Sequence, residues 1–352
     1  MRVALAIFIA LFAGGAVPPA ATGPLAPHNQ FGISPGCCIG WATPAERTRE
    51  FDDYAKIGAT WVRFDIPWSH VERRRGRYDW SVVDRVVSAA RRRGIRVIGN
   101  VTYTPAWARL APGSDDKHAP ANVAHYADFA TRVVRRYARR GVKHFELWNE
   151  PNHEVFFKPR PDAAHYAAMV RAAYRGMKAV DRSITVMIGA TAPVGAYNDP
   201  RCARGSNDDS VNINPVTFVE RLYASGIHGN FDALSHHPYA DPFGPGVAHA
   251  CSAWAQLATT SPSLRSLMVA NGDGSKRIWG TEFGSSAAGV GEETQARFVA
   301  DAIRIWRTYP WAAGLMIYSY RSPDDGQFNL VRRDWTRRAA WDAYRVSTRQ
   351  RR

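Results

Sequence analysis

Two glutamates, Glu150 and Glu282, stand where short apolar runs end, and this setting makes them candidates for chemistry. Glu150 lies in HFELWNEPN (144–152), where Pro151 lacks the N–H that a sheet ladder needs, so a strand is expected to stop there. Glu282 lies in RIWGTEFG (277–284), a second run of strand type. Two carboxyl groups whose pKa values are pushed apart can serve as proton donor and nucleophile. Held about 5–5.5 Å apart, such a pair suits retaining glycoside hydrolysis.

The elements that must position this pair follow from the hydrophobic pattern. Short β-type runs alternate with helical stretches, which is typical of βαβ units and a parallel sheet. Asn122 and Asp162 are expected helix N-caps, and Gly94 is an expected C-cap. The expected strands are 31–34, 59–66, 96–102, 144–150, 185–191, 233–239, 277–284 and 314–320. The expected helices are 45–57, 80–93, 122–140, 161–181, 215–225, 253–270, 292–308 and 336–347.

This alternation predicts an α/β fold, a single-domain (β/α)8 TIM barrel over residues 28–348. No glycine-rich phosphate fingerprint follows the first strand, which argues against a dinucleotide-binding fold. In a barrel, the carboxyl ends of the strands surround one mouth, where active sites lie. Glu150 ends the fourth expected strand and Glu282 the seventh, so they should face each other across that mouth. Two polar loops on the same face, 193–214 and 240–252, are too long to be only connectors.

Several motifs, taken jointly and in order, resemble clan A of the glycoside hydrolases. The central ones are WNEP (148–151) and TE (281–282). They are joined by Arg63 in WVRFDIPW, the following PWSHVERRRGRYDWSVVD, VTYTPAW (101–107) and His237-Pro238-Tyr239. Together these are most similar to family 39, with family 5 cellulase-like enzymes close behind. The resemblance spans most of residues 59–320.

The resemblance implies a role for each matching residue. Glu150 would be the general acid/base and Glu282 the nucleophile. Asn149 would hydrogen-bond the sugar 2-hydroxyl, a contact that strengthens as the transition state forms. Arg63 and Tyr239 would orient and ionise Glu282 through charge-assisted and hydroxyl contacts. No cofactor is implied.

The remaining expected site residues are a histidine and several aromatic residues around the sugar. His237 would position the acid/base region or the sugar. Clan members often have a Trp after strand eight as a floor for the sugar, but this chain reads MIYSYRS (316–322), so Tyr318 or Tyr320 is expected instead. Trp107 and Trp148 are the other aromatic residues expected to stack on sugar faces.

Two further polar features are expected to be structural. Glu146 has the same side-chain parity as Glu150 but lies earlier in the strand, so it should be a satisfied carboxylate of the barrel interior. The adjacent His236 and His237 could indicate a metal. No HxH occurs on the first strand, however, so zinc is not expected and no metal site is predicted.

The opening MRVALAIFIALFAGGAV has one arginine, an apolar run and then small residues, which predicts a secretory signal peptide over 1–23. The cleavage position stays open between Ala16 and Gly23, and an uncleaved anchor is the alternative. Export would make the protein secreted or cell-envelope associated. It would also permit disulfides, and Cys202–Cys251 is the favoured pair because both residues fall in neighbouring loops. Cys37 and Cys38 would then be a vicinal pair or free thiols.

The formal net charge of +15 comes mainly from arginine clusters without interleaved aromatic residues. Nucleic acid is therefore not an expected partner. A solvated surface is the simplest interpretation of the charge, and electrostatic association with an anionic cell envelope or an acidic glycan is the functional alternative. Taken together, the sequence predicts an exported retaining O-glycoside hydrolase that acts on a poly- or oligosaccharide. The alternative is a catalytically silent carbohydrate-binding barrel of the cell envelope.

Overall fold

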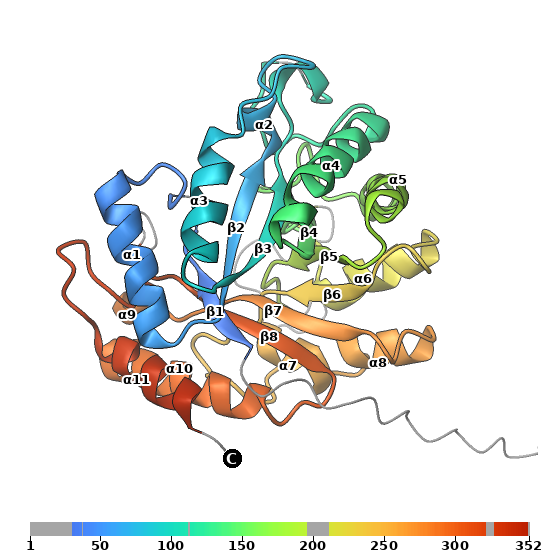
Figure 1. Cartoon of the computed structure of the whole chain (residues 1–352). Coiled ribbons are helices and arrows are strands. Elements are labelled where there is room, and N and C mark those ends of the chain that lie inside the picture. The colour runs from blue at the N-terminus through green and yellow to red at the C-terminus, as the bar shows by residue number, and fades with distance from the viewer. Residues whose placement is uncertain (1–29, 37, 112, 196–210, 322–326, 351–352) are drawn as a thin grey trace, which may run out of the picture.

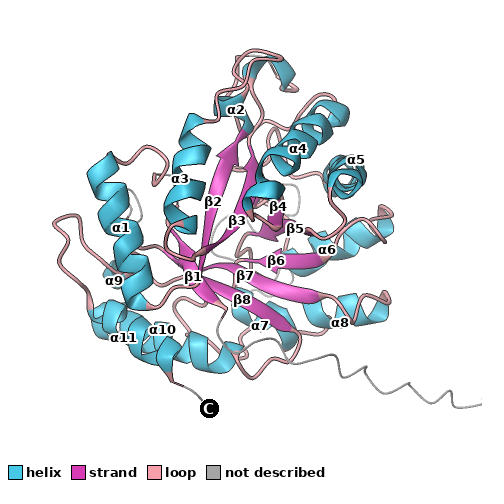
Figure 2. Cartoon of the chain, viewed as in Figure 1, coloured by secondary structure: helices cyan, strands magenta, loops and turns pink. Residues whose placement is uncertain are grey.

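The eight strands close into one barrel, and helices surround it (Figures 1 and 2). A computed structural model describes the chain except for residues 1–29, 37, 112, 196–210, 322–326 and 351–352. All strand pairs are parallel, and the order β1 to β8 follows the sequence. The α/β, single-domain (β/α)8 prediction is confirmed.

The strands have near-continuous burial, as expected where a parallel sheet is covered on both faces. Each predicted strand is present, with ends shifted by a few residues. Their bounds are β1 Phe31–Ser34, β2 Trp61–Pro67, β3 Arg96–Thr102, β4 His144–Asn149, β5 Thr185–Thr191, β6 Ala233–His236, β7 Arg277–Phe283 and β8 Ala312–Tyr318.

The predicted N-caps are confirmed, because Asn122 accepts a hydrogen bond from Ala124 N and Asp162 accepts one from His165 N. The helices are α1 Pro44–Ile57, α2 Trp68–Val71, α3 Ser81–Arg91, α4 Val123–Tyr137, α5 Ala163–Val180, α6 Pro215–Ala224, α7 Ala253–Ala258, α8 Leu264–Ala270, α9 Ala287–Val290, α10 Glu292–Trp306 and α11 Ala339–Arg349. Two 3-10 turns, η1 Ala106–Ala108 and η2 Ala138–Arg140, complete them.

One predicted helix is wrong as a single element. The stretch 253–270 forms two helices, α7 and α8, and Pro262 lies between them. Proline lacks an N–H and clashes with the preceding helical turn, so the helix cannot run through. Ser263 then caps α8 in a reciprocal pair with Ser266. Among the described residues, no helix combines the length and apolar character needed to cross a bilayer.

The end of the barrel opposite the mouth is closed by apolar side chains. Trp61 and Trp279 pack edge to face there, with ring centroids 5.0 Å apart. The Arg96 guanidinium lies over the Trp61 ring, and His144 packs against both indoles. The two indoles therefore fill this end of the barrel interior, and the active-site cavity lies at the other end.

Candidate active site

Four strands supply the charged and hydrogen-bonding groups of the mouth. Arg63 comes from β2, Asn149 from the end of β4 and Glu282 from β7. Glu150 directly follows β4, and His237 and Tyr239 follow β6. Because strand ends in a closed barrel are fixed by hydrogen bonds on both sides, these side chains are held at set distances.

The backbone turns sharply at the end of β4. Trp148 and Glu150 have φ values of 73° and 47°, in the left-handed region that non-glycine residues rarely adopt. The Glu150 N–H still donates to Ala190 O at 2.9 Å, so the turned segment stays tied to β5. The turn breaks the usual alternation of a strand and presents Glu150 to the mouth.

Arg63 is the centre of the polar network. Its Nε donates to Glu146 at 2.7 Å, its Nη1 to Glu282 at 2.5 Å, and its Nη2 to Asn149 Oδ1 at 2.7 Å. Burial opposes the charge of Arg63, but Glu146 and Glu282 outweigh it and raise the pKa of the guanidinium. Arg63 is therefore a permanent cation that links β2, β4 and β7.

Glu146 occupies the position expected of it in the barrel interior. Its side chain is fully buried, and its second oxygen accepts a hydrogen bond from Thr281 Oγ1 at 2.8 Å. Both carboxylate oxygens are thus satisfied, one by a cation and one by a hydroxyl. Glu146 holds Arg63 in place and does not line the cavity.

Glu282 is surrounded by donors suited to a carboxylate. One oxygen accepts from Arg63 and the other from the Tyr239 hydroxyl at 2.9 Å. Burial raises the pKa of Glu282, and Arg63 and Tyr239 oppose that rise by favouring the ionised form. This environment suits a nucleophile that must carry negative charge.

Glu150 has a different neighbour. Its Oε1 lies 2.8 Å from His237 Nδ1. Burial raises the pKa of Glu150 to about 7, and burial lowers the pKa of His237 to about 4, so the imidazole is neutral at neutral pH. His237 Nε2 is buried and makes no hydrogen bond within the described part of the chain, which favours the tautomer with the proton on Nδ1. Glu150 is thus a carboxyl group that can hold a proton near neutral pH.

The two carboxyl groups are close together. Ligand atoms of Glu150, His237 and Glu282 all lie within 4.8 Å of one another. That spacing is near the roughly 5–5.5 Å of retaining glycosidases and well below the 6.5–9.5 Å of inverting ones. Two carboxylates and an imidazole could also ligate a divalent cation. Here Arg63 already neutralises Glu282 at contact distance, so its charge repels a metal from this position.

A cavity of about 620 Å³ opens over the pair. Glu150, Tyr239 and Glu282 line it, and Arg63 and His237 lie behind them. Asn149 is 7% exposed and does not line it, so its expected contact with the sugar 2-hydroxyl stays a prediction. Its other lining residues are His153, Phe156, Ala192, Pro193, Val194, Asn212, Asp241, Cys251, Ala253, Tyr318 and Phe328.

Three aromatic residues expected to contact sugar lie elsewhere. Trp148 is fully buried against Tyr103 and Phe157, and its Nε1 donates to Phe156 O at 2.7 Å. Trp107 is held in η1, where its Nε1 donates to Glu72 O. Trp148 is fully buried, so its expected stacking role is corrected: it supports the loop after β4. Trp107 is partly buried and does not line this cavity, and its stacking role stays a prediction.

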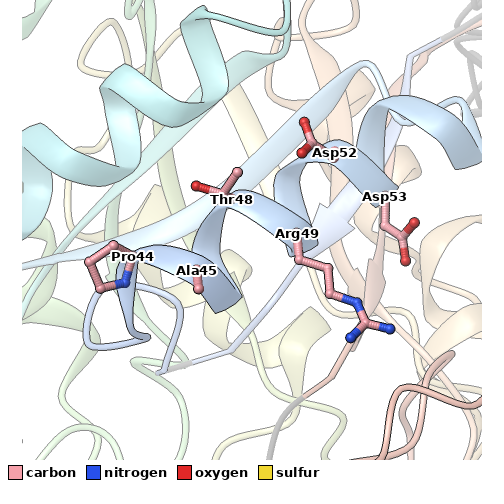
Figure 3. Close-up of a pocket in the computed structure, with 6 residues that line it drawn as sticks. All are labelled: Pro44, Ala45, Thr48, Arg49, Asp52 and Asp53. Carbon is pink, nitrogen blue, oxygen red and sulfur yellow. The ribbon is translucent and has the colours of Figure 1, made fainter.

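Tyr320 is also away from the cavity. It is fully buried, packs edge to face on Tyr54, and donates its hydroxyl to Asp53 at 2.6 Å. Asp53 belongs to a separate hollow along α1, with Arg49 beside it, as Figure 3 shows. Of the two tyrosines proposed to replace the usual tryptophan, it is Tyr318 that lines the active-site cavity.

The residues missed by sequence reasoning come from loops. Phe328 packs edge to face on Tyr239 and Tyr318 and forms part of the cavity wall. Asp241 follows β6 and accepts a hydrogen bond from Ser286 N at 3.1 Å. Asp241 lies within a stretch already noted as a long loop, 240–252, on the face of the mouth. Phe328 has no such signal, because it lies ten residues beyond β8.

The predicted Cys202–Cys251 disulfide involves a residue outside the described part of the chain. Cys251 lines the cavity, but Cys202 falls within 196–210. The pairing therefore stays a prediction. The signal peptide over 1–23 also lies outside the described residues.

This constellation at the mouth of a closed parallel barrel defines a clan A glycoside hydrolase. Comparison with protein families then gives the family: cellulase, glycosyl hydrolase family 5, matches residues 22–309. The chain belongs to this family. No curated protein sequence matches it.

Solved structures share the fold at low sequence identity. A family 39 glycoside hydrolase from Bacteroides cellulosilyticus WH2 has 21% identity and a TM-score of 0.65, covering 92% of this chain and 64% of its own. A monomeric beta-xylosidase from Caulobacter crescentus CB15 has 19% identity and a TM-score of 0.66, with coverages of 93% and 70%. A GH5_18 protein from Streptomyces cattleya in complex with GlcNAc has 15% identity and a TM-score of 0.66, with coverages of 92% and 80%. The family model confirms the resemblance to family 5, and the solved structures show that this chain shares its fold with family 39 enzymes.

Proposed function

We propose that the protein is a retaining O-glycoside hydrolase in which Glu282 is the nucleophile and Glu150 the general acid/base. The observation that carries this proposal is the unequal surroundings of two carboxyl groups at close spacing. Glu282 contacts a permanent cation and a hydroxyl, whereas Glu150 contacts a neutral imidazole. The first setting favours an anion, and the second favours a proton held near pH 7.

In the first step, a Glu282 oxygen attacks the anomeric carbon, and the bond to the leaving oxygen breaks. Glu150 transfers its proton to that oxygen, which leaves as an alcohol. The product is a glycosyl ester on Glu282. Arg63 and Tyr239 keep the attacking carboxylate in position because each holds one of its oxygens.

In the second step, Glu150 is ionised and accepts a proton from water. The resulting hydroxide equivalent attacks the anomeric carbon, the ester bond breaks, and Glu282 leaves as a carboxylate. His237 stays neutral throughout and donates to Glu150 when that carboxylate is charged. Because Asn149 Oδ1 already accepts from Arg63, its amide nitrogen is the group that would contact the sugar 2-hydroxyl.

The direct test is covalent trapping. A panel of 2-deoxy-2-fluoro glycosides with good leaving groups should give a mass increase on the peptide that contains Glu282, and the reactive member names the sugar. A label on another carboxylate would overturn the assignment. Absence of any label together with carbohydrate binding would favour the silent-barrel alternative.

We further propose that the substrate is a poly- or oligosaccharide and that the protein acts outside the cytoplasm. Two structural neighbours, a beta-xylosidase and an exo-beta-1,4-mannosidase, support an O-linked glycan as substrate. The apolar N-terminal run supports export, and the charge of +15 supports association with an anionic envelope. Mass measurement of the exported protein should show a new N-terminus after Ala16 or after Gly23. Intracellular retention of the full chain would contradict export.

A further inference from the structure

A second hollow lies at the same end of the barrel as the active site. It lies between the segments that follow β1 and β8, and because all strands are parallel these segments emerge on the mouth side. Its volume is about 370 Å³. It is lined by Pro35, Cys38, Ile39, Trp41, Ala42, Glu46, Glu50, Arg321 and Arg333.

The turn after β1 lies between the two cavities. Tyr318 lines the active-site cavity, and Pro35 lines the second one. Between them, Gly36 has a φ of 72°, and a Cβ built there would lie 3.2 Å from the Tyr318 ring. The turn after β1 therefore rests on the Tyr318 ring and joins the two sites.

The second cavity presents an aromatic face to solvent. Trp41 is 54% exposed, and it is the most exposed large aromatic side chain among the described residues. Its ring packs edge to face on His70, with centroids 5.4 Å apart, and its backbone N–H donates to Cys38 O at 3.0 Å, which fixes the chain at this position. An exposed, oriented indole is a surface for stacking on the C–H face of a sugar.

Polar groups complement this aromatic face. Glu50 is only 4% exposed yet lines the cavity, and it accepts a hydrogen bond from Tyr54 at 2.5 Å. Arg321 is held over the Trp335 ring at 4.1 Å and lies 3.4 Å from Glu46. A carboxyl group and a guanidinium offer an acceptor and donors for hydroxyl groups. Two acidic and two basic residues line the cavity, so the site selects neither an anion nor a cation by charge alone.

We propose that this cavity is a second sugar subsite, which binds a neutral sugar unit of the same glycan whose bond is cleaved in the active-site cavity. Trp41 stacks on this sugar unit, and Glu50 and Arg321 form hydrogen bonds with its hydroxyl groups. The proposal rests on the proposed function, because it assigns the second cavity to the same substrate. It implies a preference for chains long enough to reach past Tyr318.

The test uses the full chain with Glu282→Gln, so that binding is measured without turnover. Calorimetric titration with neutral β-1,4-linked gluco-, manno- and xylo-hexaoses is compared with titration by the matching disaccharides. At least one hexaose should bind more tightly than its disaccharide. Adding Trp41→Ala should weaken that hexaose by roughly three- to tenfold, the loss expected for one aromatic contact.

Two further variants make the result specific. Glu50→Gln keeps the size of the side chain and an acceptor for Tyr54, and it should also weaken hexaose binding. Val269→Ala, on an equally exposed apolar residue of α8 outside both cavities, should leave binding unchanged. Three outcomes would overturn the proposal. No hexaose binds, or Trp41→Ala leaves hexaose binding unchanged, or only uronate oligosaccharides bind in a way that depends on Trp41.

The subsite and the catalytic assignment can fail separately. Fluoroglycoside trapping on the wild-type chain reports on Glu282 and does not need the second cavity. A label on Glu282 with Trp41-independent binding would leave the function standing and remove the subsite. If a hexaose binds in a way that depends on Trp41 but no peptide is labelled, the second sugar subsite is supported and the proposed hydrolysis is contradicted.

Discussion

Glu150 and Glu282 are both carboxyl groups at strand ends, yet their surroundings differ. Glu282 has a hydrogen-bond donor on each oxygen, one from Arg63 and one from Tyr239. Glu150 has the Nδ1 of His237 on one oxygen, and burial raises the pKa of its carboxyl group to about 7. Two residues of the same type therefore differ in their chemistry because their neighbours differ. The surroundings of Glu282 suit it to attack, and those of Glu150 suit it to donate a proton.

The largest loss of activity is expected when Glu282 is replaced. Glu282→Gln removes the nucleophile but keeps an oxygen for Arg63 and a similar shape. Turnover of any cleaved glycoside should fall by at least about 10⁴-fold, as for other covalent nucleophiles. Steady-state kinetics measures this, with Val269→Ala as the control for surface truncation. Retention of more than a tenth of the activity would show that Glu282 does not attack.

The loss of activity in Glu150→Gln should be smaller than in Glu282→Gln, and its size should depend on the leaving group of the substrate. General acid catalysis is typically worth about 10²–10⁴-fold, so alkyl or sugar leaving groups should lose that much. Activated aryl glycosides need little protonation, and their first step should be nearly unaffected. Equal losses for both kinds of substrate would contradict the role of Glu150 as an acid.

Tyr239→Phe tests the donor set of Glu282. It removes the hydrogen bond to one oxygen and leaves the ring in place against Tyr318 and Phe328. A hydrogen bond to a charged group contributes about 1.5–3 kcal/mol, so kcat/KM should fall by about ten- to hundredfold. The rate of trapping by a fluoroglycoside is the readout. An unchanged rate would show that Arg63 alone is sufficient.

Glu146→Gln should change the pH profile more than the maximal rate. Activity requires protonated Glu150, so kcat/KM should fall as pH rises through about 7. The Glu146 charge helps to raise the pKa of Glu150, so removing it should lower that pKa and shift the alkaline limb to lower pH. The profile of kcat/KM against pH is the measurement. A limb that stays in place would mean that Glu146 does not influence Glu150.

The sequence alone predicts the positions of those site residues that strand geometry determines. Arg63, Asn149, Glu150 and Glu282 lie on or directly after strands, so the register of a closed barrel brings them together without reference to loops. For the same reason, Glu146 could be placed in the interior from its position in the strand.

Aromatic positions were harder to predict, because their direction depends on local backbone turns and loop packing. Trp148 lies within β4, but its positive φ directs the ring into the core. Tyr318 and Tyr320 have the same parity, and only the structure distinguishes the one in the cavity from the one hydrogen-bonded to Asp53. Phe328 reaches the cavity wall from a distant loop that carries no periodic pattern.

The sharp turn at the end of β4 has a consequence for how this protein can evolve. A non-glycine residue in the left-handed region loses roughly 1–2 kcal/mol, and Glu150 also keeps a carboxyl group away from water. Glu150→Gly would relieve both penalties, so the chain should melt at a higher temperature while losing its acid. Selection for heat resistance alone would therefore favour inactive descendants, and any search for thermostable variants of this barrel needs a simultaneous screen for turnover.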